Sequence, residues 1–323
     1  MRKRSLLVVN PSATTTTSRT RDVLIAALSR DLDVAVVTTE GRGHATELAR
    51  KAAADGVDIV IALGGDGTIN EVVNGLLADA PTERSAASVP ALGIVPGGSA
   101  NVLARTLGLP RDPVEATGAL LAALRDDTVR VIGLGRLDER WFTFSAGMGV
   151  DAEVVQLVEA RRVAGARSSP ALWVRTATRG ILFGTDRRKP SMTVRELEGG
   201  DAAFAGLFLV IVSNTAPWTY LGRRAVNLSP AASFDTGLDL VGFRTLRTVP
   251  TLLAAGQMIW SAGGPTSRRA LRLADRSGFE VTASRPVACQ VDGDYVGTLD
   301  RAVFRSVPAA LRVHAVPPAG DPM

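Results

Sequence analysis

The chain has one cysteine and two histidines among its 323 residues. A single cysteine, Cys289, excludes an internal disulfide and a cysteine-based zinc site, so a reducing compartment is the simplest expectation. The histidines, His44 and His314, lie far apart in the sequence, which argues against histidine-led catalysis. No apolar run approaches the ~20 residues needed to cross a bilayer, and the apolar stretch 6–9 is too short for a signal peptide. We therefore expect a cytoplasmic protein, soluble or peripheral at the inner membrane face.

Aromatic residues are scarce at 5%, and only three of the 37 basic residues are lysine. The net charge is +5, and arginines supply the remaining basic residues along the whole chain. Because basic clusters with interleaved aromatic residues are lacking, the sequence does not indicate a nucleic-acid partner. The modest positive charge favours a nucleotide, a phosphorylated product or an acidic membrane face.

Residues 1–133 alternate short apolar runs with helical patterns of about ten residues. This alternation is typical of an α/β domain with a doubly wound parallel sheet. The expected strands cover residues 6–9, 34–37, 59–63 and 92–95, and the expected helices cover residues 19–29, 45–54 and 69–77.

The pattern changes near residue 133 to strands separated by turns. We expect residues 134–314 to form a second, mostly antiparallel β-sandwich domain, and residues 315–323 to form a frayed tail. The expected strands cover residues 140–145, 191–196, 207–214, 238–243, 280–283 and 287–291, and the expected helices cover residues 152–160, 171–183 and 249–260.

The run 59–71 is the most informative segment, since a buried strand ends in three glycines around the carboxylate of Asp66. Glycines allow close backbone approach to a ligand, and the N-terminus of a following helix favours phosphate. Asn70 stands where a dinucleotide-binding fingerprint needs its third glycine, and the chain contains no P-loop motif. We expect a different phosphate site here, although a purely structural glycine turn is the alternative.

Two other expected strands also end in polar or glycine residues, at 10–12 and 96–99. Ligands of doubly wound sheets collect at the carboxyl ends of the strands. Each segment alone has a plainer interpretation, a strand-ending turn for the first and a helix capped by Ser99 for the second. Their convergence with Asp66 predicts one site.

Two acidic segments follow later. Asp292-Gly293-Asp294 indicates either a hairpin turn or a pair of projecting carboxylates that includes a general base. The segment 235–239 is equally a turn or a cation site. Basic residues between 161 and 167 and at 187–189 are either a solvated surface or a face for anionic membrane. Trp173 is either an apolar contact for lipid or, the favoured interpretation, part of the core packing of its helix.

Several motifs occur in the order found in a known family, and the chain resembles bacterial members of the diacylglycerol kinase catalytic-domain family, which includes sphingosine kinases. The match covers roughly residues 5–315, whereas the glycine block alone is shared with NAD kinases and phosphofructokinases. The matching segments are residues 10–12, 64–74, 96–105, 147–152, 230–231, 235–239 and 291–294.

The resemblance implies a two-domain enzyme, with a nucleotide-binding domain and a lipid-substrate domain, that uses ATP and Mg²⁺. It implies Asp294 as general base and Asp66 as the residue serving Mg²⁺ and phosphate, or itself as base. Asp235 would join Asp66 as a metal ligand, and Asn74, Asn101 and Asp292 would contact substrate. ATP would be held by Asn10, Pro11, Ser12, Ala13, Thr14, Thr39, Gly64, Gly65, Asp66, Gly67, Thr68, Ile69, Asn70, Glu71 and Ser99.

The chain departs from the family pattern at several positions. Ala13, Ser99 and Val102 replace a frequent glycine, threonine and aspartate, and look like tolerable variants. Asp294 is one methylene shorter than the usual glutamate. Thr236 replaces an aspartate that binds a structural Mg²⁺ in some members.

The function implied by the resemblance is phosphorylation of a lipid hydroxyl, diacylglycerol to phosphatidic acid, in phospholipid biosynthesis. An NAD kinase-like enzyme is the enzymatic alternative, disfavoured because its paired Asn-Glu adenosine segment has no counterpart here. A catalytically silent lipid- or nucleotide-binding regulator is the second alternative. The sequence leaves the acyl preference open, and equally whether the chain forms a homodimer.

Overall fold

A computed structural model describes residues 2–13, 17–79, 86–163, 191–244, 256–258 and 270–315. Several predictions from the sequence concern residues outside these ranges. They are Thr14, Trp173, the basic residues 167 and 187–189, the helix 171–183, most of the helix 249–260 and the tail from 316. The chain divides into two compact units, Met1–Gly133 with Ala309–Met323 (unit 1) and Leu134–Pro308 (unit 2).

The expected second domain, 134–314, needs a correction at its end. Residues from Ala309 onward belong to unit 1 because Val313 pairs in parallel with Leu92 and the N–H of His314 donates to the carbonyl of Leu92 at 2.9 Å. The return of the chain to unit 1 was not predicted, because no strand was expected after residue 291.

Unit 1 is built on a parallel sheet in the order β4-β3-β1-β2, with β4 also pairing with the end of β16. Every residue of β3 and β4 is buried, whereas β2 lies at the edge and is largely exposed. The four strands are β1 (Lys3–Val9), β2 (Leu32–Thr38), β3 (Ile59–Gly64) and β4 (Ala91–Pro96).

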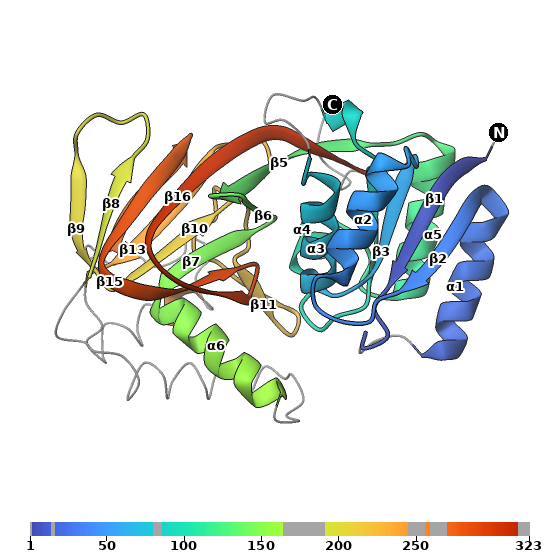
Figure 1. Ribbon diagram of the computed structural model, residues 1–323, viewed down its shortest axis with the longest axis horizontal. Helices are drawn as coiled ribbons and strands as arrows, with labels where there is room; N and C mark the ends of the chain where they lie inside the picture. The colour runs from blue at the N-terminus through green and yellow to red at the C-terminus, as the bar shows by residue number, and fades with distance from the viewer. Residues whose placement is uncertain are drawn as a thin grey trace. The chain divides into compact units, whose positions relative to one another are not determined.

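Helices cover both faces of this sheet, which confirms the doubly wound prediction (Figure 1). Leucines of α1 and α5 pack on one face with Leu7, Ile61 and Leu63. On the other face α2 and α3 approach so closely that a Cβ at Gly75 would collide with the carbonyl of Thr46. The helices are α1 (Ser18–Asp31), α2 (His44–Ala54), α3 (Asp66–Leu76), η1 (Ala86–Ser88), α4 (Val102–Thr106) and α5 (Pro113–Arg125).

Local sequence explains where α5 begins. The Asp112 carboxylate accepts hydrogen bonds from the N–H groups of Val114 and Glu115, and Pro113 occupies the first helical position. Both are typical of a helix N-terminus. By contrast, α3 begins at Asp66, three residues earlier than predicted, so Gly67 and Thr68 are helical.

Unit 2 is antiparallel in its strand pairings among the described residues, as predicted. Its core includes Phe142, Phe279 and Phe304, each fully buried. The helix α6 (Val150–Val163) packs against β7, β10 and β15. The strands of this unit are β5 (Arg130–Leu137), β6 (Arg140–Phe142), β7 (Ser145–Gly149), β8 (Met192–Glu196), β9 (Ala203–Leu207), β10 (Leu209–Ser213), β11 (Thr219–Leu221), β12 (Arg224–Val226), β13 (Leu238–Phe243), β14 (Ala270–Arg276), β15 (Gly278–Val291) and β16 (Asp294–Val313). Of these, β5 and β16 continue into unit 1.

Three strand predictions need correction. The expected strand 140–145 is two strands, because the N–H groups of residues 143–145 turn toward the Asp292 carboxylate. The expected strand 207–214 is broken at Phe208, whose N–H bonds to Phe243 instead. The expected strands 280–283 and 287–291 form one strand, β15, with a register shift between Thr282 and Val287.

None of the helices in the described residues combines the length and apolarity that crossing a bilayer requires.

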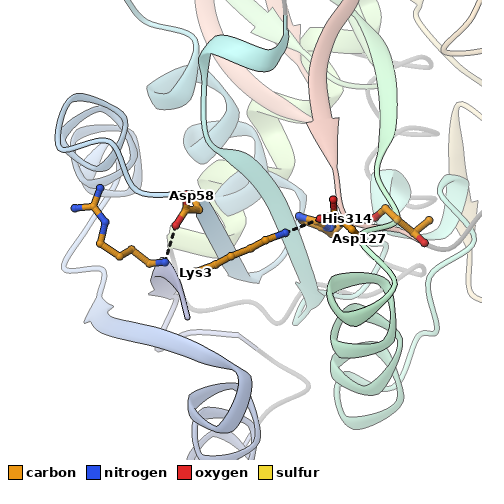
Figure 2. Close-up of polar contacts among 6 residues, drawn as sticks. Lys3, Asp58, Asp127 and His314 are labelled. Atoms are coloured by element: carbon orange, nitrogen blue, oxygen red, sulfur yellow. Dashed lines mark hydrogen bonds and ion pairs between the residues drawn. The ribbon is translucent and has the colours of Figure 1, made fainter. Parts of the chain in front are cut away.

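The returning end of β16 lies beside Lys3 and Asp127 in unit 1 (Figure 2). Lys3 Nζ is 2.6 Å from Asp127 Oδ1, and His314 Nδ1 is 3.1 Å from the carbonyl of Thr128. His314 is 2% exposed, and this burial lowers its pKa below the ordinary value. The hydrogen bond with the Thr128 carbonyl and the charge of Asp127 oppose this lowering, whereas the positive charges of Lys3 and Arg312 add to it.

We expect His314 to make the protein less stable in mild acid. The unfolded chain takes up a proton near pH 6.5, whereas folded His314 takes it up only at lower pH, so the free energy of unfolding falls as pH drops below about 6.5. His314→Asn keeps a donor for the Thr128 carbonyl but cannot titrate. Urea unfolding at pH 7.5, 6.5 and 5.5 should show that the variant loses less stability than the wild type. Parallel profiles would contradict this.

Candidate active site

Four strand ends meet at the carboxyl edge of the unit 1 sheet. Backbone hydrogen bonds join Asn10 N to Leu63 O (2.9 Å), Thr39 N to Val9 O (2.8 Å) and Gly97 N to Gly64 O (2.7 Å). The register of the parallel strands therefore brings together the segments that the sequence singled out after β1, β3 and β4, with Thr39 after β2 beside them.

The glycines of these segments are needed for contact between loops. A Cβ at Gly98 would lie 2.7 Å from Gly65 Cα, and one at Gly97 would lie 2.9 Å from Ala13 Cβ. A Cβ at Gly64 would lie 2.6 Å from Thr68 Oγ1. These glycines let the loops after β3 and β4 pack against each other, and their predicted contact with a ligand stays a prediction.

Asn10 organises the end of β1. Its Nδ2 donates to Thr68 Oγ1 at 2.8 Å, and its Oδ1 accepts the N–H of Ser12 at 2.9 Å. Thr68 is buried, whereas Pro11 and Ser12 are exposed and Ala13 is half-buried. Asn10 thus links β1 to the first turn of α3 and leaves the hydroxyl of Ser12 at the surface.

Asp66 is the first residue of α3 and is partly exposed. Its Oδ1 is 3.4 Å from the N–H of Leu103, in α4. Helix geometry leaves the N–H groups of the first turn without acceptors inside the helix, and the helix N-terminus favours negative charge. The N-cap, Gly65, has no side chain to satisfy them. This edge therefore offers backbone donors beside one carboxylate, a combination suited to phosphate and a cation.

Asn101 shapes the loop after β4. Its Oδ1 accepts the N–H of Gly98 at 2.9 Å and its Nδ2 donates to the carbonyl of Gly98 at 2.7 Å. Asn101, buried and with φ of 49°, is the N-cap of α4, so Ser99 is not the helix cap that the sequence offered as the plainer interpretation. Ser99 is exposed, so its hydroxyl faces solvent.

Further along α3, Ile69 and Asn70 are buried, and Asn74 Nδ2 donates to the carbonyl of Asn70 at 2.9 Å. The structure thus gives Asn101 and Asn74 local contacts within unit 1, and their predicted contact with substrate stays a prediction.

Glu71 has a structural role that the sequence did not indicate. Its two carboxylate oxygens accept the N–H groups of Gly43 (2.9 Å) and Ala45 (3.2 Å), at the N-terminus of α2. A carboxylate at a helix N-terminus accepts hydrogen bonds from unpaired N–H groups and interacts favourably with the positive end of the helix dipole. Glu71 therefore caps a neighbouring helix, and its predicted contact with ATP remains a prediction.

We expect Glu71→Ala to lower the free energy of unfolding by about 1–2 kcal/mol, because the loss of a helix cap has this size. Glu71→Gln keeps one acceptor oxygen and should lose less. Glu40→Ala, which removes an exposed glutamate just before α2, is the matched control. Urea unfolding without nucleotide measures all three, and a Glu71→Ala protein as stable as the wild type would contradict the capping role.

In unit 2, Asp292 and Gly293 form the two-residue turn between β15 and β16, with φ of 49° and 81°. Two positive φ values are typical of a type I′ hairpin turn. The Asp292 carboxylate accepts four hydrogen bonds, from Thr143 N (2.7 Å), Thr143 Oγ1 (2.8 Å), Phe144 N (3.0 Å) and Ser145 N (3.1 Å). Burial raises the pKa of Asp292, and these donors oppose that rise. Asp292 therefore holds the turn in place.

Asp294 follows as the first residue of β16 and is partly exposed. The hairpin turn that the sequence offered as one alternative is present, and Asp292 is buried in it rather than projecting. The role of Asp294 as general base stays a prediction. Unit 2 holds Asp294 and Asp292, whereas unit 1 holds Asp66 and the other predicted ATP contacts.

Three further residues, to which the sequence assigned no role, surround this turn. Gln290 Nε2 donates to Asp151 Oδ2 at 2.7 Å, and Gln290 Oε1 accepts the N–H of Gly293 at 2.9 Å. Glu159 Oε1 accepts the N–H of Tyr295 at 3.0 Å. Removal from water raises the pKa of Asp151 to about 6, against the hydrogen bond from Gln290. Gln290 could have been found as the one polar residue in the apolar run 287–291.

The predicted second metal ligand, Asp235, is exposed in unit 2. Nearby, Asp239 Oδ1 accepts the N–H of Asp275 at 2.9 Å, and Asp275 Oδ1 accepts the N–H of Gly237 at 2.7 Å. Within the described residues, no three acidic, histidine or cysteine side chains gather closely enough to hold a metal ion. Asp235 as a metal ligand stays a prediction.

Comparisons with known proteins concern the sequence and the fold of the chain. Residues 4–136 match the family model "Diacylglycerol kinase catalytic domain". The chain is 37% identical over 151 residues to "Diacylglycerol kinase" of Staphylococcus haemolyticus, covering 46% of this chain and 42% of that protein. It is 43% identical over 118 residues to "Probable lipid kinase YegS-like" of Chromohalobacter salexigens, covering 36% of this chain and 35% of that protein. The matches thus span about two fifths or less of these curated relatives.

Solved structures extend the likeness of fold to the whole chain. A diacylglycerol kinase from Bacillus anthracis strain Sterne superposes with a TM-score of 0.70 at 18% identity, covering 98% of this chain and 97% of that one. At this identity the likeness concerns the fold alone, whereas the family model matches residues 4–136. Residues 4–136 are therefore similar in sequence to the diacylglycerol kinase catalytic domain.

Proposed function

We propose that the protein is an ATP-dependent lipid kinase that phosphorylates a lipid hydroxyl, with diacylglycerol as the first candidate acceptor and phosphatidic acid as the product. The observation that carries this proposal is the position of Asp66 at the N-terminus of α3, where the segments after β1, β3 and β4 converge. The names of the relatives support the same class, since they include both diacylglycerol kinases and a lipid kinase without a stated acceptor.

The residues present fit ATP. The first turn of α3 offers backbone donors for phosphate oxygens, and the exposed hydroxyls of Ser12 and Ser99 lie on two of the converging segments. Thr39, after β2, is half-buried beside the end of β1. Asn10 and Glu71 act here by holding these segments together.

The same residues also fit a Mg²⁺ ion that binds together with the nucleotide. A carboxylate beside a phosphate-binding edge repels the phosphates unless a cation lies between them, and Asp66 is in that position. Mg²⁺ usually takes one or two carboxylates with phosphate oxygens and water rather than an all-protein cage. When bound, Mg²⁺ and ATP supply the transferable phosphoryl group and neutralise part of its charge.

The residues of this chain then have distinct roles. Asp66 orients the cation, and the first turn of α3 orients phosphate oxygens through backbone N–H groups. Asp294 accepts the proton of the lipid hydroxyl on a carboxylate oxygen as that hydroxyl attacks, which makes it the general base. Asp292 holds the turn that carries Asp294.

The decisive experiment measures label transfer from γ-labelled ATP with Mg²⁺ in mixed micelles. Diacylglycerol, monoacylglycerol, ceramide and sphingosine are offered in turn, and NAD is offered separately. Labelled lipid that disappears in Asp66→Ala supports the proposal and names the acceptor class. Label on NAD alone would assign an NAD kinase-like activity, and no label on any acceptor would favour a binding protein without catalysis.

A further inference from the structure

Helix α6 contacts the turn that bears Asp294 through two separate hydrogen-bonding routes. In one, Asp151 of α6 accepts from Gln290 Nε2, and Gln290 Oε1 accepts from the N–H of Gly293. In the other, Glu159 of α6 accepts directly from the N–H of Tyr295. The N–H of Tyr295 belongs to the peptide group that follows Asp294, and the N–H of Gly293 belongs to the peptide group that joins Asp292 to Gly293, so the chain on both sides of Asp294 is tied to one helix.

The residues of the first route are buried and closely packed within unit 2. Gln290 is 2% exposed, and its neighbours Cys289 and Val291 point into the apolar core on the opposite face of β15. Gly147 pairs with Gln290 across β7, and a Cβ there would lie 2.5 Å from Asp151 Oδ2 and 3.0 Å from Gln290 Nε2. A glycine at 147 therefore leaves the space that the Asp151–Gln290 contact occupies.

We propose that Gln290 and Glu159 are positioning residues through which α6 sets the place of the Asp294 carboxylate. The inference rests on the proposed function, in which Asp294 is the general base. The hydrogen bonds of Asp292 attach the base of the turn to residues 143–145, and the α6 contacts hold its two sides. Because a reacting group misplaced by about 1 Å can cost roughly 10²-fold in rate, these contacts act on turnover rather than on nucleotide binding.

The test compares two disrupting variants with conservative ones. Gln290→Leu removes both amide contacts, and Glu159→Met removes the acceptor for Tyr295 N–H, whereas Glu159→Gln retains an acceptor oxygen. Gln156→Met, at an exposed position of the same helix, is the matched control. Gly147→Ala disturbs the Asp151–Gln290 contact without removing either partner, and serves if Gln290→Leu fails to fold.

We expect kcat to fall about 10- to 100-fold in Glu159→Met and Gln290→Leu with the KM for ATP unchanged. Glu159→Gln and Gln156→Met should stay within about twofold of the wild type. Amide hydrogen exchange, followed by NMR, should become faster at Gly293 in Gln290→Leu and at Tyr295 in Glu159→Met, and not in the conservative variants.

The outcomes separate this inference from the proposed function. If the wild type transfers phosphate and the disrupting variants turn over equally fast, the positioning role is wrong and the proposed function stands. If amide hydrogen exchange at Gly293 and Tyr295 becomes faster in these variants while kcat is unchanged, the positioning role is likewise wrong and the proposed function stands. If the wild type transfers phosphate to no acceptor, the proposed function fails, and the catalytic role of these contacts fails with it.

Discussion

Asp66→Asn is expected to reduce phosphoryl transfer by on the order of 10³-fold, the scale on which single charge-stabilising groups act in such reactions. The variant keeps the size and shape of the side chain and its acceptor oxygen for Leu103 N–H, 3.4 Å away in the wild type. It loses the negative charge that would hold Mg²⁺ beside the phosphates. The folded structure should therefore persist while turnover disappears.

Labelled-ATP turnover and the Mg²⁺ dependence of nucleotide binding check this prediction together. Asp55→Asn removes an equal charge at an exposed position after α2 and should remain fully active. If Asp66→Asn binds the nucleotide with the same dependence on Mg²⁺ as the wild type and still loses turnover, Asp66 acts as a base and not as a cation ligand. Full activity would remove it from the site.

Asp294→Asn is expected to keep ATP binding and lose about 10²- to 10⁴-fold in turnover, the range associated with a general base. Asparagine cannot take up the proton of the attacking hydroxyl. The turn should survive the change, because its hydrogen bonds run through Asp292, Gly293 and Tyr295 rather than through the side chain of Asp294.

ATP affinity by titration calorimetry and turnover in mixed micelles should therefore diverge in this variant. Asp300→Asn is the control, since Asp300 is exposed on the same strand, β16. Asp294→Glu offers a second comparison, because the added methylene restores the side-chain length common in the family. Unchanged turnover in Asp294→Asn would leave Asp66 as the sole candidate base.

Much of unit 1 was predictable because its signals are local. The predicted strands 6–9, 59–63 and 92–95 lie within β1, β3 and β4. Parallel strands buried on both faces have near-continuous apolar runs, which are easily recognised in a sequence. The same local pattern puts Asp66 after β3, and the rule that ligands bind at strand ends then predicts the site at this edge.

Unit 2 was harder to predict because its strands depend on partners distant in sequence. The expected strand 140–145 breaks because three of its residues donate to Asp292, almost 150 positions later. β16 was missed altogether, and it carries the chain from Asp294 in unit 2 to Val313 in unit 1. No local window contains both members of such a pair.

The sequence by itself determined the α/β class of the first unit, the antiparallel class of the second, and the segments after β1, β3 and β4 as the candidate site. These follow from hydrophobic periodicity and from glycine and carboxylate spacing, which act over a few residues. Only the tertiary structure decided what particular polar groups do. Glu71 caps α2, Asp292 holds its turn, and Gln290 joins α6 to Gly293, because each hydrogen bond depends on a partner that folding alone brings within 3.2 Å.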